Sequence, residues 1–174
     1  FHGENMLDEL QHHYDTLEEA RQALIHKVRN LESQLLGHKP GPDRWSILED
    51  LQHLVLAEQR TSLEEGSVLD SEERKPGMFE MVLQVLDHDT VVDVPDPGMI
   101  PDGNATLEGL ITAWDKSRIG LFKFLESCKP EDLERPVSRH PVTGPITMME
   151  CLRLIDSHFH HHRRRIEAVI EQIK

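Results

Sequence analysis

The chain of 174 residues has the length of one average domain and is long enough to bury a hydrophobic core without disulfide bonds. Its formal net charge of -13 argues against nucleic acid as a partner, because the molecule as a whole would repel phosphate groups. The cysteines, Cys128 and Cys151, stand far apart, which fits neither a disulfide framework nor a zinc ribbon.

The sequence shows no sign of a membrane protein. No stretch approaches the roughly 20 consecutive apolar residues that a membrane-spanning helix needs. The beginning, FHGENMLDEL, lacks a basic region followed by an apolar one and so does not resemble a secretion signal. We expect a soluble protein of the reducing cytoplasm that has neither membrane nor nucleic acid as a partner.

The first part of the chain predicts two helices. Apolar residues recur at steps of three and four from Leu7 to Leu35, which predicts one long amphipathic helix that ends at Gly37. The prolines of GHKPGPDRW cannot continue it. The second helix is predicted to begin at Ser46, whose hydroxyl can accept the backbone N–H of Glu49 while the Glu49 carboxylate bonds back. Such a capping box contributes about 1 kcal/mol.

A long crossover follows. From residue 66 to residue 103 the helical pattern weakens, prolines punctuate the chain, and only MFEMVLQVL is apolar enough for one short helix. The third long helix carries its apolar stripe from Leu107 to Leu125, and the fourth runs from Thr147, with a second capping box to Glu150, to the end of the chain.

These patterns predict the fold class. Four long helices with almost no strand-like alternation indicate an all-α four-helix bundle, and we expect residues 1–174 to form a single domain. The long crossover between helices two and three can return the chain to its starting end. The predicted order is therefore up-down-down-up.

The residues with the clearest chemical potential lie in DSHFHHHRRRIEAV. On the fourth helix, His162 occupies the position between Phe159 and Ile166 where the pattern asks for an apolar side chain. His158 lies one turn earlier on the same side, about 6 Å away, so the two imidazoles can bind one ion. His160 and His161 point to other faces and are weaker candidates. Three neutral imidazoles and a water would form an open, reactive metal site.

A plainer interpretation also fits these residues. The sequence holds 12 histidines, so one His pair at this spacing is expected by chance. HHHRRR can equally be a solvated cationic surface that complements the dipole of the helix end. His53, in WSILEDLQHL, falls almost opposite Leu51, so periodicity places it at the surface. Only a second buried face or a cleft would bring His53 to the other two histidines.

Two segments resemble the DinB-like (YfiT-like) family of bundles. WSILEDLQHLVLAE is similar to the family's second-helix pattern of a tryptophan, a helix start, a glutamate and then a histidine followed by leucine. HPVTGPITMMECLRLIDSHFHHHRRRIEAV is similar to its other pattern, a His-Pro, Gly-Pro and Thr lead-in before a helix that bears HxxxH. Both patterns occur in the right order and spacing, whereas the first and third helices add only hydrophobic periodicity.

The resemblance implies a metal site. By analogy His53, His158 and His162 are the ligands of one divalent ion, which in the family is zinc, nickel, manganese or iron, with water completing the shell. It further implies a small-molecule substrate, a homodimer, and either transfer chemistry with a low-molecular-weight thiol or hydrolysis. The RRR that follows His162 is heavier in charge than the family pattern, and facing solvent is favoured over lining an anion-accepting mouth of the site.

The expected mechanism depends on the metal. An ion with three neutral ligands keeps its full charge and acidifies a bound water or thiol toward a pKa of about 7. Glu49, one turn before His53, is a candidate to accept an imidazole N–H or a proton, although the capping box already accounts for it. Catalytic residues beyond the metal ligands are not identified.

Other conspicuous residues are predicted to be structural. Trp45 and Trp114 are expected to anchor the core, and Cys151 to be a small buried hydrophobic residue. His88 and His140 are placed in loops and given no role. Two functional hypotheses therefore remain, a metal-dependent transferase or hydrolase and a non-catalytic helical bundle for interaction or dimerisation whose metal site is unused or regulatory.

Overall fold

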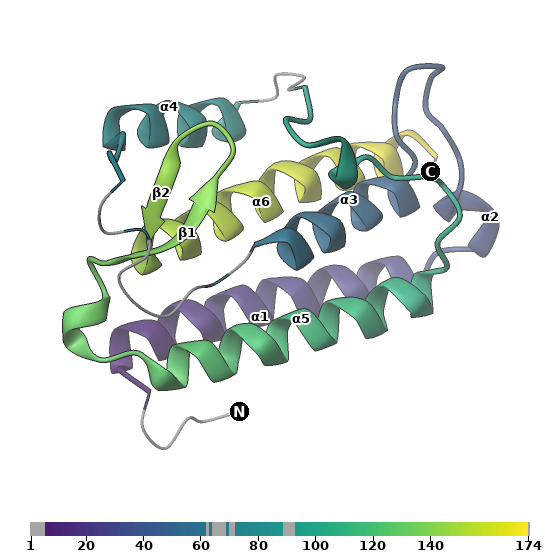
Figure 1. The fold of residues 1–174 in the computed structure, drawn as a ribbon. Helices are drawn as coiled ribbons and strands as arrows, with labels where there is room; N and C mark the ends of the chain where they lie inside the picture. Colours follow the sequence, from purple (N-terminus) through teal and green to yellow (C-terminus); the bar gives the residue numbers. More distant parts are fainter. Residues whose placement is uncertain (1–5, 62, 64–68, 70–71, 89–92, 174) are drawn as a thin grey trace.

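The structure is a computed structural model that describes residues 6–61, 63, 69, 72–88 and 93–173. Its framework consists of four long helices, α1 (Asp8–Arg29), α3 (Ile47–Arg60), α5 (Leu107–Ser127) and α6 (Met148–Gln172), which pack as a bundle (Figure 1). The predicted all-α four-helix bundle is therefore confirmed.

Local chemistry defines the start of two helices as predicted. At α3 the Ser46 hydroxyl accepts the N–H of Glu49 at 3.2 Å, and the Glu49 carboxylate accepts the N–H of Ser46 at 2.8 Å. Thr147 and Glu150 repeat this arrangement at α6, with the same two distances. Each box satisfies backbone N–H groups that the first turn of a helix leaves without partners.

The first predicted helix is interrupted. Instead of one helix to Leu35, α1 ends at Arg29 and a one-turn helix, α2 (Ser33–Leu36), follows. The side-chain amide of Asn30 donates to the carbonyl of His26 at 2.8 Å, a local bond that competes with continuation of the backbone ladder. The hydrophobic stripe alone did not reveal this break.

The structure adds a small antiparallel hairpin that the sequence did not predict. Its strands, β1 (Pro136–His140) and β2 (Gly144–Thr147), are too short for a clear alternation. The ring nitrogen Nδ1 of His140 accepts the backbone N–H groups of Val142 and Thr143, and Gly144 adopts a φ of 73°, which favours glycine. The hairpin therefore places His140 on a strand, not in the loop that was predicted.

The crossover contains the short helix that the sequence predicted, α4 (Pro76–Asp87), and a 3-10 turn, η2 (Pro97–Met99). Parts of this crossover lie outside the described residues. Another 3-10 turn, η3 (Pro130–Asp132), links α5 to the hairpin. Both α4 and the hairpin pack on α6, on the side away from α1 and α5 (Figure 1).

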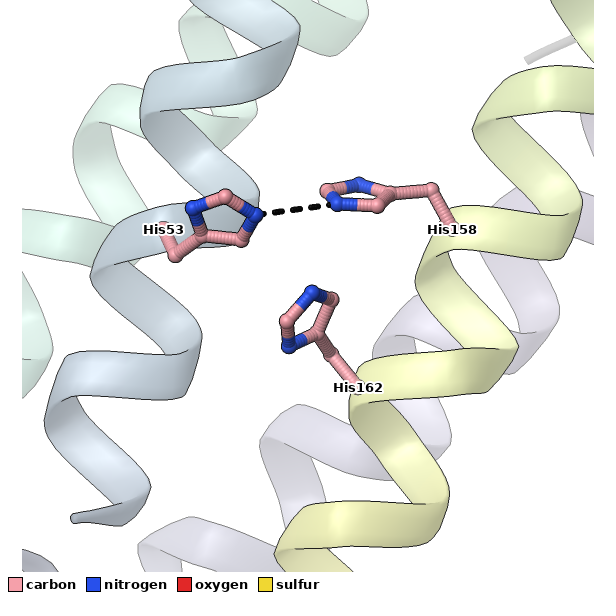
Figure 2. Close-up of side chains that lie close together, drawn as sticks. All are labelled: His53, His158 and His162. Atoms are coloured by element: carbon pink, nitrogen blue, oxygen red, sulfur yellow. Dashed lines mark hydrogen bonds between the residues drawn. The ribbon is translucent and has the colours of Figure 1, made fainter. Parts of the chain in front are cut away.

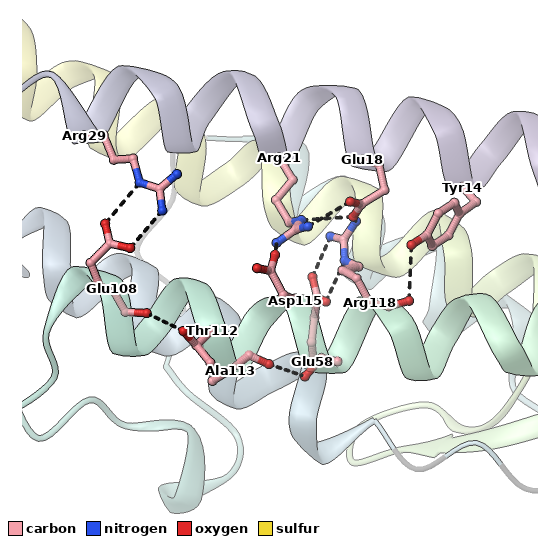
Figure 3. A network of polar contacts seen from close by, with 11 residues as sticks. Tyr14, Glu18, Arg21, Arg29, Glu58, Glu108, Thr112, Ala113, Asp115 and Arg118 are labelled. Atoms are coloured by element: carbon pink, nitrogen blue, oxygen red, sulfur yellow. Dashed lines mark hydrogen bonds and ion pairs between the residues drawn. The ribbon is translucent and has the colours of Figure 1, made fainter. Parts of the chain in front are cut away.

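Two hydrophobic clusters fill the bundle. One joins the N-terminal half of α1, the C-terminal half of α5 and the N-terminal half of α6 to α4 and the hairpin. The other joins α2 and α3 to the opposite halves of the same helices. Polar residues separate the clusters along the helices: Arg21 on α1 and Arg118 on α5 are buried there, and the partly exposed Glu18 and Asp115 pair with them (Figure 3).

Candidate metal centre

Three imidazole rings from two helices meet at the middle of the bundle. His53 comes from α3, and His158 and His162 come from α6 (Figure 2). Their ring centroids lie 4.6 to 4.9 Å apart, and one nitrogen from each ring lies within 4.8 Å of the other two. The closest pair of atoms is Nε2 of His53 and Nε2 of His158, at 3.0 Å. The structure thus brings together all three histidines that the sequence analysis singled out.

His53 is buried, with an exposed fraction of 4%, although helical periodicity placed it at the surface. The reason is that α3 packs against α5 on one side and against α6 and η2 on another, so two of its faces are covered. Nδ1 of His53 lies 2.7 Å from the carbonyl oxygen of Met99 in η2. Since a carbonyl only accepts, Nδ1 carries the proton and Nε2 presents a lone pair.

His162 is oriented in the same manner by an acidic residue. Its Nδ1 donates to Oδ1 of Asp50 at 2.7 Å, which leaves its Nε2 as the lone-pair nitrogen. Asp50 is only 1% exposed, and its Oδ1 also forms an ion pair with Nε of Arg165 at 3.3 Å. Metal-binding histidines characteristically donate their second ring nitrogen to a carboxylate or carbonyl in this way.

Burial keeps the three rings neutral. It is the largest cause that lowers the pKa of His53, brings the pKa of His158 to about 3, and holds the pKa of His162 well below its usual value. The neighbouring histidines lower the pKa values of His158 and His162 further. The contact of His162 with Asp50 is therefore a hydrogen bond from a neutral imidazole.

Burial shifts the pKa of Asp50 in the opposite direction. Burial raises the pKa of this carboxyl group to about 7, while the guanidinium of Arg165 acts to lower it. A divalent cation bound by the neighbouring His162 would favour the ionised carboxylate as well.

The donor set fits a divalent metal ion. Neutral imidazole nitrogens suit zinc, copper, iron and nickel, and two of these three have a fixed tautomer that turns Nε2 toward the common centre. Two ligands of one ion at about 2.1 Å each lie roughly 3 to 3.5 Å apart, and the 3.0 Å separation of the closest pair falls in this range. His53, His158 and His162 are therefore the residues that can hold such an ion.

A cavity of about 710 Å³ opens beside the three histidines. It extends between α3, α4, α6, the hairpin and the segment from Asp93 to Met99. Pockets of this size accept small organic molecules. The histidines line one part of the cavity, so a molecule inside it can reach their nitrogens.

Several predicted roles need correction. Trp45 does not anchor the core, because its ring lines the cavity, lies 5.0 Å from the ring of His53 and stacks on that of His162 at 6.1 Å. Trp114 is 1% exposed and does belong to the core. Glu49 forms the capping box and pairs with Lys39, so the carboxylate beside the histidines is that of its neighbour Asp50.

The arginines after His162 do not simply face solvent. Arg165 lines the cavity, and its guanidinium lies 5.4 Å from the ring centre of Trp45. Arg164 donates to the carbonyl of Leu86 at 2.8 Å. Part of this segment therefore belongs to the wall of the cavity. Arg165 stands three residues after His162 and hence on the same side of α6, so the helical period could have indicated its position.

His140, His161 and Cys151 also line the cavity. His140 was given no role from the sequence, and Nδ1 of His161 lies 3.0 Å from the carbonyl of Leu86. Cys151 is fully buried, as predicted, and burial raises the pKa of its thiol to about 12. A thiol with this pKa is a poor nucleophile at neutral pH.

Comparisons with known proteins identify the family and the fold. A family model of the DinB superfamily matches residues 16–166, so the chain belongs to the DinB superfamily. A crystal structure described as that of TT2238, a four-helix bundle protein, shares the fold with a TM-score of 0.56 and 17% sequence identity, over 89% of this chain and 96% of that one. No curated protein matches the chain.

Among the described residues, no helix is sufficiently long and apolar to cross a membrane.

Proposed function

We propose that the protein is a divalent-metal-dependent enzyme in which His53, His158 and His162 hold the ion. The observation that carries this proposal is the direction of the ring nitrogens. Two of the three rings donate Nδ1–H to fixed acceptors, and their Nε2 atoms converge with the third ring beside an open cavity.

A divalent ion held by three neutral imidazoles supplies a Lewis acid that lowers the pKa of a water or thiol bound to it. Residues of the protein orient the ligands and control their protonation. Asp50 and the carbonyl of Met99 fix two ligands, so little reorganisation is needed when the ion binds. Burial lowers the pKa values of His158 and His162 and so keeps protons from competing for their lone pairs.

The proposed reaction is either the transfer of a low-molecular-weight thiol to an electrophilic small molecule or the hydrolysis of such a molecule. The superfamily and the accessible cavity support a small substrate. We further propose zinc, nickel, manganese or iron as the ion, and a homodimer as the form in solution. Size-exclusion chromatography with light scattering tests the dimer.

Metal analysis of protein purified without a nickel column tests the site. We expect about one divalent ion per chain, and its loss from a His162→Ala variant. His160→Ala is the matched control, because His160 lies on the same helix but pairs with Asp156 at 3.2 Å instead of joining the cluster. Wild-type protein that folds normally but binds none of the four metals would overturn the proposal.

Activity is tested by incubating the metal-loaded protein with bacillithiol, mycothiol or glutathione and a model electrophile, and separately with activated esters. Turnover by the wild type and not by His162→Ala would identify the reaction class. A metal-loaded protein without a rate above background in either assay would favour the alternative, a helical interaction bundle with an unused or regulatory metal site.

A further inference from the structure

Exposed apolar side chains gather at the cavity. Among the described residues six large hydrophobic side chains are exposed, and four of them line this cavity. They are Met78 at 41%, Met81 at 59%, Val85 at 42% and Val142 at 43%. Scattered apolar residues are normal on a protein surface, but a cluster around one opening marks a binding site for apolar material.

The helix α4 is apolar on two sides. Phe79, Leu83 and Leu86 are buried and account for the packing of α4 against the bundle. Met78, Met81 and Val85 lie on another side of α4. They are exposed and line the cavity, so they do not contribute to the bundle core. The helix therefore presents a second apolar face to the space that leads to the three histidines.

Other parts of the lining share this apolar chemistry. Val94, Pro95 and Met99 line the cavity from the segment before and within η2, and Leu154 and Ile155 line it from α6. Apolar side chains from three segments therefore line the same space. A molecule inside it would bury apolar area against more than one of them.

The charged groups of the lining disfavour a negatively charged tail. The arginines that line the cavity have acidic partners: Arg60 pairs with Asp96 at 3.2 Å, Arg165 with Asp50 at 3.3 Å, and Arg139 with Glu72. The lining also includes the carboxylates of Asp43 and Asp93, which repel an anion. At a distance from the histidines the cavity thus favours an apolar group without negative charge.

We propose that the substrate carries an uncharged apolar arm, alkyl or aryl, which lies along Met78, Met81 and Val85 of α4 while its reactive polar group reaches the three histidines. This inference rests on the proposed function, because the position of the reactive end assumes a metal ion. The flexible methionines adapt to arms of different shape. Continuity of the apolar wall with the three-histidine site favours a small molecule over a second copy of the chain.

Alkyl hydroxamates test this proposal, because the hydroxamate group chelates metal ions while the chain length varies. Calorimetry on zinc-loaded protein compares acetohydroxamate with octanohydroxamate. Each buried methylene improves affinity by roughly fourfold, so burial of only two of the roughly six additional methylenes would make octanohydroxamate bind more than about tenfold tighter. Equal affinity for the two compounds would overturn the proposal while leaving the metal site intact.

A variant with a matched control locates the arm. Met81→Asp places a charge on the exposed face of α4 and should abolish most of the chain-length gain, with unchanged zinc content and acetohydroxamate affinity. Ile119→Asp is the control, because Ile119 is similarly exposed at 52% but lies on α5 and does not line the cavity. Equal losses in the two variants would contradict the assignment to α4.

A metal-independent measurement separates this inference from the proposed function. Metal-free protein should bind the uncharged fluorescent probe Nile red in the cavity, octanol should displace it, and Met81→Asp should weaken binding. If no metal binds, the proposed function fails while this assay still tests the apolar site. Conversion of a dimer to a monomer by Met81→Asp, without an effect of chain length, would show that a second copy covers the face.

Discussion

Two polar clusters are buried in this bundle, and they handle burial in opposite ways. In the first, the guanidinium of Arg118 donates to both carboxylate oxygens of Glu58 at 2.8 and 2.7 Å and also reaches Glu18 at 3.2 Å (Figure 3). Arg21 pairs with Glu18 and with Asp115. This ion-pair network keeps its charges, because each charged group has a partner of opposite sign.

The three-histidine cluster instead loses its charge. Asp50 is the carboxylate that contacts this cluster, through His162, and burial lowers the pKa values of His53, His158 and His162. The ion-pair network closes on itself, whereas the three histidines turn ring nitrogens toward one another, with Nε2 of His53 and Nε2 of His158 3.0 Å apart. The comparison teaches that oppositely charged partners mark a structural cluster, and that neutral nitrogen ligands converging on one point mark a place for a cation.

Breaking the ion-pair network should produce the largest effect on stability. Arg118→Met leaves the largely buried carboxylate of Glu58 without its guanidinium partner and takes one of two arginine partners from Glu18, so we expect a loss of about 3–5 kcal/mol in the free energy of unfolding. Urea unfolding followed by circular dichroism measures this loss. Arg29→Met is the control, because Arg29 makes a similar paired contact with Glu108 at the exposed surface and should lose far less. Comparable losses would refute the distinction.

Changing the hydrogen-bond acceptor that orients His162 should weaken metal binding without unfolding the protein. Asp50→Asn removes the charge that faces His162, and we expect metal affinity to fall by roughly 10- to 100-fold. Competition with a chromogenic chelator measures this affinity. Glu49→Gln is the control, since Glu49 caps the helix and touches none of the ligands. An unchanged affinity in Asp50→Asn would remove Asp50 from the site.

The smallest effect concerns Tyr14, which borders the ion-pair network. Its hydroxyl donates to the backbone carbonyl of Arg118 at 3.3 Å, and burial, with help from Glu18, raises its pKa to about 12. Because the unfolded chain ionises near pH 10, the contribution of Tyr14 to stability is complete below pH 10 and is lost as the pH rises toward 12.

Tyr14 is the only tyrosine of the chain, so the ultraviolet absorbance of tyrosinate reports on it alone. An ordinary pKa near 10 in the folded protein would contradict the burial of its hydroxyl. Unfolding of Tyr14→Phe at neutral pH should differ from the wild type by only about 1 kcal/mol.

Features set by neighbouring residues could be predicted from the sequence. Both capping boxes depend on side chains three residues apart, and the HxxxH pair depends on a single turn of helix. The break after Arg29 is also local, but the bond of Asn30 to His26 competes with a hydrophobic stripe that continues past it. A hydrophobic pattern is judged over many residues, so it does not reveal a break caused by one side-chain hydrogen bond.

Features that depend on packing could not be predicted. The burial of His53 follows from the contact of α3 with both α5 and α6, so only the family resemblance indicated its role. The contact of Asp50 with the site, in contrast, could have been predicted, because Asp50 stands three residues before His53 and hence on the same side of α3. The hairpin was missed because each of its short strands is defined mainly by the other.

The position of Trp45 gives the molecule an intrinsic optical probe. Its indole lies 5.0 Å from the ring of His53 and 6.1 Å from that of His162, whereas Trp114, the other tryptophan, lies in the core. Arrival of an ion at the histidines therefore changes the surroundings of one emitter and spares the other. A Trp114→Phe protein would report occupancy by its fluorescence, in real time and without any added label.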